Sequence, residues 1–243
     1  MKRLSFWAYA IILLIPAYVF QSCQDDGDST YLWRPTALVT VRPAAGNGFT
    51  LQLDDETTLY PSNMPVSPYG DKEVRALVNY TDEGGRGDVR SVRINWMDSI
   101  RTKKPVPTLG ADDDARYGKD AIEIVRDWVT VAEDGYLTLR LRTRWGHRNT
   151  PHYVYLVSGV NPDNPYEFEL RHDAKGDTEG IMGDALIAFN LNGLPENEGQ
   201  EIRLKLNWKS FSGKKSAEFD LKLRPVTYKD DSFDDITRNS LIK

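Results

Sequence analysis

The segment Glu201-Ile202-Arg203-Leu204-Lys205-Leu206-Asn207-Trp208 alternates polar and apolar side chains along its whole length. Successive side chains of a β-strand point to opposite faces, so this period of two predicts a strand with one buried and one solvent-exposed face. The same alternation recurs in residues 73–80, 136–142 and 217–223, and no long helical pattern separates these segments. The chain is therefore predicted to be all-β.

Short strand-like segments occupy the chain between residues 37 and 223 and fall into two groups. Five of them, separated by Gly, Pro, Asn and Asp clusters, lie within residues 37–97, which favours a small barrel or sandwich. About seven more lie within residues 121–223, and that number fits an immunoglobulin-like sandwich without its Cys–Trp–Cys core. Residues 100–120 are charged and contain proline, which is typical of a domain boundary.

The N-terminus carries the pattern of a secretory signal. Lys2 and Arg3 precede an apolar run, residues 4–20, and the small residue Ser22 lies directly before Cys23. A basic region, an apolar region and a small residue before the cleavage point define a signal peptide. With cysteine at that point the segment resembles the lipobox of bacterial lipoproteins, which predicts a signal peptide over residues 1–22 and lipidation of Cys23.

Two features of this segment bear on alternative interpretations. A transmembrane anchor needs about 20 apolar residues, and the run here is shorter, is interrupted by Pro16 and lacks a basic cluster after it. Phe20 and Gln21 depart from the commonest lipobox, which has an aliphatic residue three positions before the cysteine. The signal peptide remains the favoured interpretation.

The residues after Cys23 are small and acidic, with Asp25, Asp26 and Asp28 close together. Such a segment cannot bury enough apolar area to fold by itself, so residues 23–34 are predicted to form a tether. It also resembles the export signal with which Bacteroidetes direct lipoproteins to the outer leaflet of the outer membrane. The protein is therefore expected in the cell envelope, as a surface-exposed outer-membrane lipoprotein.

The charge of the chain argues against nucleic-acid binding, and its cysteine content excludes an intramolecular disulfide bond. The chain has 31 basic and 36 acidic residues, and removal of residues 1–22 leaves a net charge of −7. Nucleic-acid binding depends on basic side chains that neutralise phosphates, so no nucleic-acid partner is expected. Cys23 is the single cysteine, so no intramolecular disulfide can form.

No cofactor or metal site is predicted from the residues. The spacing of His147 and His152 around a proline matches no standard zinc motif. The triplet at residues 112–114 consists of three aspartates but lacks the alternating ligands and distal glutamate of a calcium loop, so a turn or a helix start is expected there.

Four phrases of the sequence resemble one known family, the NigD-like lipoproteins of Bacteroidetes. They are residues 49–55, 75–80, 118–128 and 169–177, which read FTLQLDD, RALVNY, GKDAIEIVRDW and ELRHDAKGD. The resemblance covers nearly the whole mature chain. It implies an N-terminal OB-like barrel over residues 35–115 and a C-terminal β-sandwich over residues 116–228, followed by a polar tail, residues 229–243.

The family name derives from a bacteriocin operon, so the resemblance implies a role in immunity or secretion and brings no catalytic residues. The leading hypothesis is a non-catalytic binding or accessory protein, not an enzyme, with an unknown protein or glycan partner. OB barrels bind oligosaccharides across strands two and three. A glycan-binding alternative therefore uses aromatic residues of the barrel, namely Phe49, Tyr60, Tyr69 and Tyr80.

The most polar phrase of the second domain contains Arg171 and His172, followed by Asp173. A histidine held by a carboxylate can act as a general base, which gives a remote hydrolase hypothesis. Adjacent strand residues point to opposite faces, however, so Asp173 cannot easily orient His172. The favoured interpretation is a strand end whose Arg171 or His172 contacts a neighbouring loop, with both residues as candidate ligand contacts.

The lipoprotein assignment makes Cys23 a residue that determines location and not folding. Replacement of Cys23 by Ala is expected to release the protein from the membrane fraction without unfolding it, because the cysteine lies outside both predicted domains. Fractionation of cells followed by circular dichroism of the released protein measures both effects. Continued membrane attachment of the Cys23→Ala protein would overturn the assignment.

Overall fold

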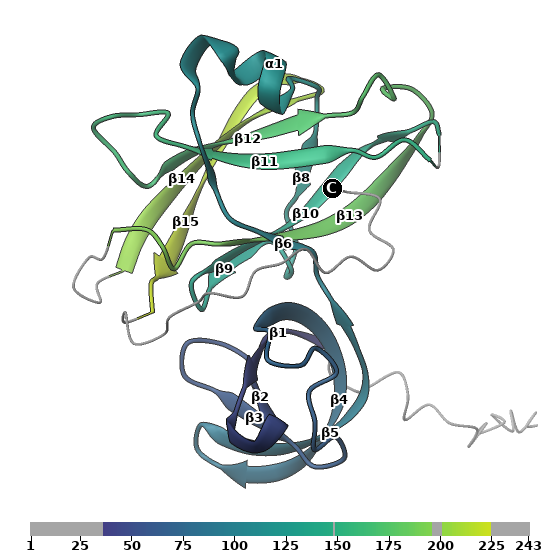
Figure 1. Cartoon of the computed structure of the whole chain (residues 1–243), viewed down its shortest axis with the longest axis vertical. Helices are drawn as coiled ribbons and strands as arrows, with labels where there is room; N and C mark the ends of the chain where they lie inside the picture. Colours follow the sequence, from purple (N-terminus) through teal and green to yellow (C-terminus); the bar gives the residue numbers. More distant parts are fainter. Residues whose placement is uncertain (1–35, 148, 196–200, 225–243) are drawn as a thin grey trace, which may run out of the picture. The chain divides into compact units, whose positions relative to one another are not determined.

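The computed structural model describes residues 36–147, 149–195 and 201–224. The predicted signal peptide, Cys23 with its tether, and the polar tail lie outside these residues. Strands make up most of the described chain (Figure 1). Its helical parts are short: η2 (Ala45–Asn47), η3 (Gly110–Asp112) and the five-residue α1 (Asp113–Tyr117). None of the described helices has the length and apolar character needed to cross a membrane.

The first five strands close into a barrel, with neighbours in the order β1-β2-β3-β5-β4 and β4 paired back to β1. All pairs are antiparallel except β3 with β5. The strands are β1 (Thr36–Pro43), β2 (Phe49–Gln52), β3 (Thr58–Pro61), β4 (Val74–Arg86) and β5 (Val89–Ser99). The predicted OB-like barrel is confirmed.

The alternation in β4 determines which side chains fill the barrel. Val74, Ala76, Val78 and Tyr80 are buried in its core, as their period of two predicts. Arg75 lies on the opposite face of the strand and is nevertheless 0% exposed. The outer face of β4 at this point is therefore covered by another part of the chain.

The remaining strands form two sheets packed as a sandwich. One sheet has the order β6-β13-β10-β8, with β9 also paired to β10, and the other has the order β15-β14-β12-β11-β7. The first sheet consists of β6 (Thr102–Lys103), β8 (Glu123–Val125), β9 (Val131–Glu133), β10 (Tyr136–Trp145) and β13 (Ile181–Asn190). The second consists of β7 (Val106–Pro107), β11 (Tyr153–Ser158), β12 (Glu167–Asp173), β14 (Glu201–Ser210) and β15 (Gly213–Lys222).

The sandwich begins earlier in the chain than residue 116, where the sequence placed it. Thr102 already pairs with Ala188 of β13, and Val106 pairs with Val157 of β11. The charged, proline-containing connection thus supplies one short edge strand to each sheet. Its two-residue strands are too short to show alternation, which is why the sequence pattern indicated a linker.

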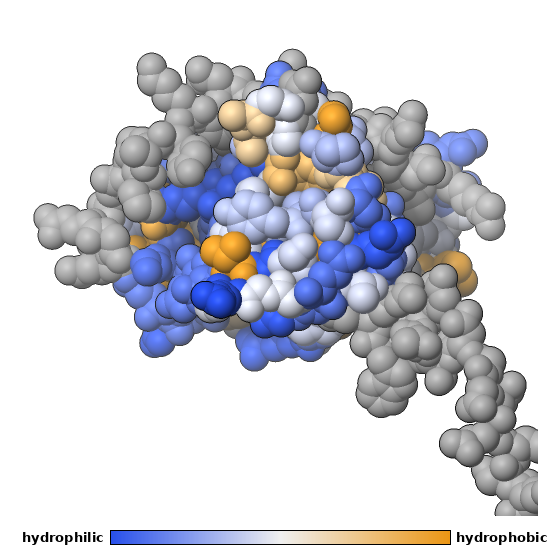
Figure 2. Space-filling view, turned by 90° about the horizontal axis from the view of Figure 1, so that it is seen from below, coloured by the Kyte–Doolittle hydropathy of each residue, from blue (hydrophilic) through white to orange (hydrophobic). Residues whose placement is uncertain are grey.

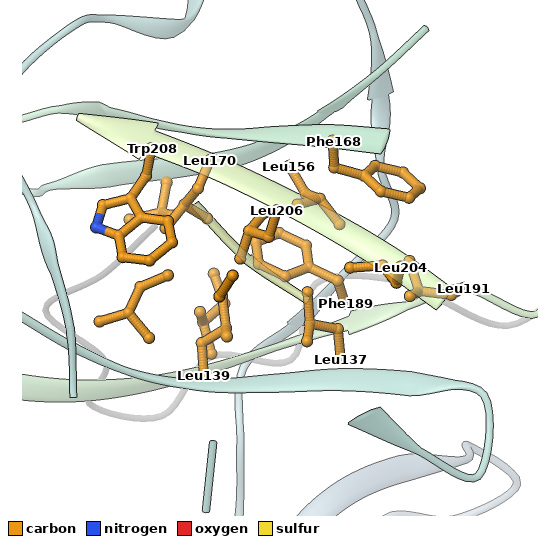
Figure 3. Packing of buried hydrophobic residues seen from close by; sticks show 14 of the residues in the cluster. Leu137, Leu139, Leu156, Phe168, Leu170, Phe189, Leu191, Leu204, Leu206 and Trp208 are labelled. Atoms are coloured by element: carbon orange, nitrogen blue, oxygen red, sulfur yellow. The ribbon is translucent and has the colours of Figure 1, made fainter. Parts of the chain in front are cut away.

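The sandwich core consists of the inward side chains of both sheets (Figure 3). Leu137 and Leu139 of β10 face Leu204 and Leu206 of β14 across it, and Phe189 lies between them. Truncating one such leucine to Ala costs about 2–5 kcal/mol, since apolar burial is lost and a cavity remains. The alternation in residues 201–208 thus gives the buried and exposed faces correctly.

Residues 127–131 belong to the strand-like segments after residue 121, but Asp127–Thr130 form a turn and only Val131 belongs to a strand. The strand β9 ends at Glu133 and a two-residue hairpin leads to Tyr136 of β10. Asp134 and Gly135 both have positive φ, 51° and 74°. Asp-Gly is the preferred pair for this turn, and the resulting hairpin places two carboxylates side by side.

Those carboxylates join the sandwich to the barrel, and the two domains belong to one compact unit. Arg75 donates to Glu133 at 2.6 Å and to Thr40 at 2.9 Å. Asp134, 3% exposed, forms ion pairs with Arg42 of β1 and with Arg224 after β15. Buried charges are stable only when they are paired and hydrogen-bonded, and this cluster meets both conditions.

A tyrosine lies at the centre of the same cluster. The ring of Tyr136 is fully buried, and its centroid lies 5.5 Å from the guanidinium of Arg75 and 5.2 Å from that of Arg224. Its hydroxyl donates to Glu73 at 2.6 Å, and Glu73 also accepts from Arg224 at 2.7 Å. The cluster of Arg42, Glu73, Arg75, Glu133, Asp134, Tyr136 and Arg224 is called the charged junction below.

Replacement of Arg75 by Ala is expected to lower the free energy of unfolding by about 3–5 kcal/mol, because it leaves the partly buried carboxylate of Glu133 without its cation. Burial already raises the pKa of Glu133, and the nearby Arg75 opposes that rise. Denaturant unfolding measures the change. Arg203→Ala is the matched control: Arg203 is 65% exposed in its pairs with Glu218 and Asp220, and exposed pairs contribute about 0–1 kcal/mol. Equal losses in the two variants would contradict a buried, stabilising junction.

Candidate functional site

A groove of about 610 Å³ lies over the outer face of the second sheet of the sandwich. Strands β12 and β14 form its floor, and the segment from Asp114 to Asp120 and the β14–β15 hairpin contribute to its lining. Polar and charged side chains predominate among the lining residues, which include Arg171. The groove is called the sandwich groove below.

The floor follows from the alternation of two paired strands. Phe168 and Leu170 of β12 point into the core, so Glu167, Glu169 and Arg171 point outward. The parallel pairing of β12 with β14 places Glu167 beside Lys205 and Glu169 beside Asn207. Hydrogen bonds from Asn161, Asn207 and Lys205 lower the pKa of Glu167 to about 2, so this carboxylate stays ionised.

Arg171 fixes the segment from Asp114 to Asp120, which forms one side of the groove. Its guanidinium donates to Asp114 of α1 at 2.5 Å and to Glu169 at 3.1 Å, and its side chain is 15% exposed. Next to it, Gly118 has φ +80° and passes so close to β12 that a Cβ there would lie 2.4 Å from the carbonyl oxygen of His172. Only glycine fits this close approach, which brings Lys119 and Asp120 to the groove.

The basic end of the groove is formed by the β14–β15 hairpin. Lys209 and Lys214 are directly opposite each other in the antiparallel register, and both are exposed. Like charges in this position destabilise a sheet. The Nζ of Lys209 donates to the carbonyl of Lys119 at 2.9 Å, and neither lysine of the pair has a carboxylate partner among the described residues. The hairpin end of the groove therefore presents two lysines without ion-pair partners in the described chain, while four carboxylates line the rest of it, those of Asp114, Asp120, Glu167 and Glu169.

Beneath the floor lie two buried histidines. His152 is 0% and His172 is 1% exposed, and the Nδ1 of His152 lies 2.9 Å from the Nε2 of His172. The other ring nitrogen of each also has a partner: Nδ1 of His172 lies 3.2 Å from the carbonyl of Ala121, and Nε2 of His152 lies 3.4 Å from Asp177. Burial lowers the pKa of His172 to about 4. His172 borders the groove, but both its ring nitrogens have partners inside the protein, so neither is free for a ligand.

Asp177 is 4% exposed and accepts from the backbone amides of Gly146 and His147. The amide of His147, followed by the ring of the same residue, lowers the pKa of Asp177 to about 2. Asp173, the sequence neighbour of His172, forms an ion pair with Lys175 instead. The residue that faces the histidine pair is thus Asp177, which the sequence reasoning did not single out.

The four aromatic residues proposed for glycan stacking differ in exposure. Phe49 and Tyr80 are buried in the barrel core, and Tyr69 packs against that core with its pKa raised by burial. Tyr60 of β3 is 46% exposed. A stacking platform needs several accessible ring faces, and of these four residues Tyr60 is exposed and Tyr69 half-buried.

A second, smaller pocket of about 420 Å³ is lined by residues 104–105, 158 and 190–194. In the view of Figure 2 most coloured residues are hydrophilic or neutral, and apolar residues occur in small patches. No group of three or more His, Cys, Asp or Glu side chains in the part of the chain described could hold a metal ion. The middle of the aspartate triplet, Asp113, is buried at the start of α1, where it accepts from Thr108 and from the amide of Leu109.

Comparison with known proteins agrees with this architecture. The sequence matches the NigD-like N-terminal OB domain over residues 38–100 and the NigD-like C-terminal beta sandwich domain over residues 104–221. The chain belongs to the NigD-like family. No curated protein matches it.

Solved structures of other chains share the NigD-like architecture. A suspected toxin-related protein from Parabacteroides distasonis is 31% identical, with 81% of this chain and 94% of that chain covered and a TM-score of 0.65. A NigD-like immunity protein from Bacteroides caccae is 22% identical, with 76% and 91% covered and a TM-score of 0.55. A suspected lipoprotein from Bacteroides fragilis is 12% identical, with 79% and 99% covered and a TM-score of 0.55. The last two show the fold alone.

The lowered pKa of His172 predicts acid sensitivity. Unfolded histidine takes up its proton near pH ~6.5, whereas folded His172 does so only near pH 4. The unfolded state binds more protons between these values, so the free energy of unfolding should fall by on the order of 3 kcal/mol as the pH drops through this window. Unfolding of the wild type and of His172→Gln across this range measures it. An identical pH dependence in both proteins would contradict the assignment.

Proposed function

We propose that the chain is a non-catalytic, lipid-anchored protein of the cell envelope that binds an acidic surface of a partner protein through the sandwich groove. The anchor is Cys23, and the outer membrane with exposure at the cell surface is the proposed location. The observation that carries the proposal is the cross-strand pair of Lys209 and Lys214 at the edge of a polar groove.

Charge complementarity is the physical reason for this choice of partner. An acidic chain that keeps two opposed lysines without carboxylate partners forgoes stability in the sheet, and an anionic ligand would offset that cost. Complementary charges across an interface also direct the encounter and exclude wrong partners. The description of the Bacteroides caccae neighbour as an immunity protein supports a partner that is itself a protein.

The geometry of the groove favours binding over catalysis. A general base must come within hydrogen-bond reach of its substrate, and His172 is buried with both ring nitrogens engaged. The other charged groups of the floor, Glu167 and Arg171, are fixed by several hydrogen bonds each. Groups held in place in this way suit recognition of a surface.

Replacement of Lys214 by Glu tests the proposal with little risk to the fold, because the new carboxylate would face Lys209 and should stabilise the hairpin. The anchored wild type should recover a reproducible protein from detergent-solubilised envelope, and Lys214→Glu should lose it. Lys222→Glu is the matched control, since Lys222 is an exposed residue at the other end of β15, opposite Glu201.

Recovery of the same protein by the wild type and the Lys222→Glu variant, together with its loss from Lys214→Glu, is the expected pattern. Raising the salt concentration should weaken the recovery, because exposed charges are screened. Recovery that is equal in all three proteins, or absent from the wild type, would contradict the proposed binding surface. An acidic polysaccharide retained in place of a protein would also contradict it.

A further inference from the structure

The two buried histidines, His152 and His172, form a continuous chain of contacts through the sandwich. It runs from the carbonyl of Ala121 to His172 at 3.2 Å, from His172 to His152 at 2.9 Å, and from His152 to the carboxylate of Asp177 at 3.4 Å. Each end of this chain is an acceptor. A carbonyl oxygen cannot donate, and Asp177 stays ionised because its pKa is lowered to about 2.

Each of these three contacts is a hydrogen bond only if a proton lies between its two atoms, so the chain of contacts needs three protons. The protons must lie on the rings, since neither end of the chain supplies one. Two neutral imidazoles carry one proton each and so bring only two. With two protons, one of the three contacts would place two lone pairs against each other in a buried site, where an unmade hydrogen bond is costly.

We infer that the pair His152–His172 is a buried proton-binding site that holds one proton more than two neutral histidines, with Asp177 as its counter-ion. The same three groups tie separate segments of the sandwich together. His172 holds the carbonyl of Ala121, next to the groove wall, while Asp177 holds the amides of Gly146 and His147. The added proton therefore completes the hydrogen bonds that hold the segments of Ala121 and of Gly146–His147 to the residues of the histidine pair.

The surroundings assign the positive charge to His152. The low pKa of His172 keeps that ring neutral, with its proton on Nδ1 and its Nε2 as an acceptor. His152 then donates in both directions. Its ring lies 4.1 Å from the ring of Trp145, centroid to centroid, and aromatic faces attract cations.

The other titratable groups near the pair are few in the described residues. Asp120 and Asp173 both act on His172 by their negative charge, and both favour a positive charge on the pair. His147, whose side chain is 81% exposed, shares Asp177 from the solvent side, with its Nδ1 3.1 Å from the carboxylate.

The proton count fixes the sign of the pH dependence. Two unfolded histidines are mostly neutral above pH ~6.5. The folded pair keeps its extra proton there, so the folded state binds more protons and the free energy of unfolding falls as the pH rises. Below pH ~6.5 the low pKa of His172 lowers the free energy of unfolding, as described above. The contribution of the pair to the free energy of unfolding should therefore be largest near pH ~6.5 and smaller at lower and higher pH.

Long-range ¹H–¹⁵N correlation spectra of the wild-type protein, labelled in its histidines, count these protons directly. At pH 7 His152 should show protons on both ring nitrogens and His172 a proton on Nδ1 only. This measurement needs no variant and does not depend on the proposed groove function. Two singly protonated rings at pH 7 would overturn the inference.

A second measurement compares unfolding between pH 7 and pH 9. The free energy of unfolding of the wild type and of His147→Gln should fall with rising pH at the same rate, which corresponds to a difference of up to one bound proton between the folded and unfolded states. The free energy of unfolding of His152→Gln should depend less on pH. His147→Gln is the matched control because it removes a histidine that contacts the same Asp177 from outside. Equal slopes in wild type and His152→Gln would also overturn the inference.

Discussion

The interaction on which the structure most depends is the buried ion pair between Arg75 and Glu133, with the pairs of Asp134 beside it. A chain whose single cysteine precedes both domains has no disulfide to join them, and buried charge takes that role. The partners are far apart in sequence: Arg75 lies in the barrel, Asp134 in the first hairpin of the sandwich, and Arg224 after its last strand. Removing one partner leaves another charge uncompensated, so the junction links the folding of both domains.

The alternation of polar and apolar residues was sufficient to predict two β-domains and the buried face of their main strands. Alternation in β4 and β14 gave the inward residues correctly, and the resemblance to the NigD-like family supplied the OB topology that strand spacing could not. The same alternation put Arg75 on an outer face, but nothing local indicates that another domain covers that face. The two-residue strands β6 and β7 escaped detection because a period of two cannot be read from two residues. The Asp-Gly pair at residues 134–135 was the available signal for the hairpin that builds the junction.

The site was only partly predictable for a related reason. Arg171 was singled out from its polar phrase and does line the groove, whereas His172 points into the core with a second histidine 20 residues away as its partner. Lys209 and Lys214 become neighbours through the register of a hairpin, and the parallel pairing of β12 with β14 brings them to the same groove as Arg171. Such pairings between distant strands depend on tertiary structure. The sandwich thus carries a polar groove with a basic end on its outer face, and the proposed proton-binding histidine pair lies inside.

The most direct test of this account is site-specific photo-crosslinking in living cells, with a photoreactive residue placed at position 214 and, separately, at position 222. The account predicts that position 214 yields a covalent adduct with one envelope protein and that position 222, exposed on the same strand, does not. Adducts that are equal at both positions, or absent at position 214, would contradict a binding surface at the sandwich groove.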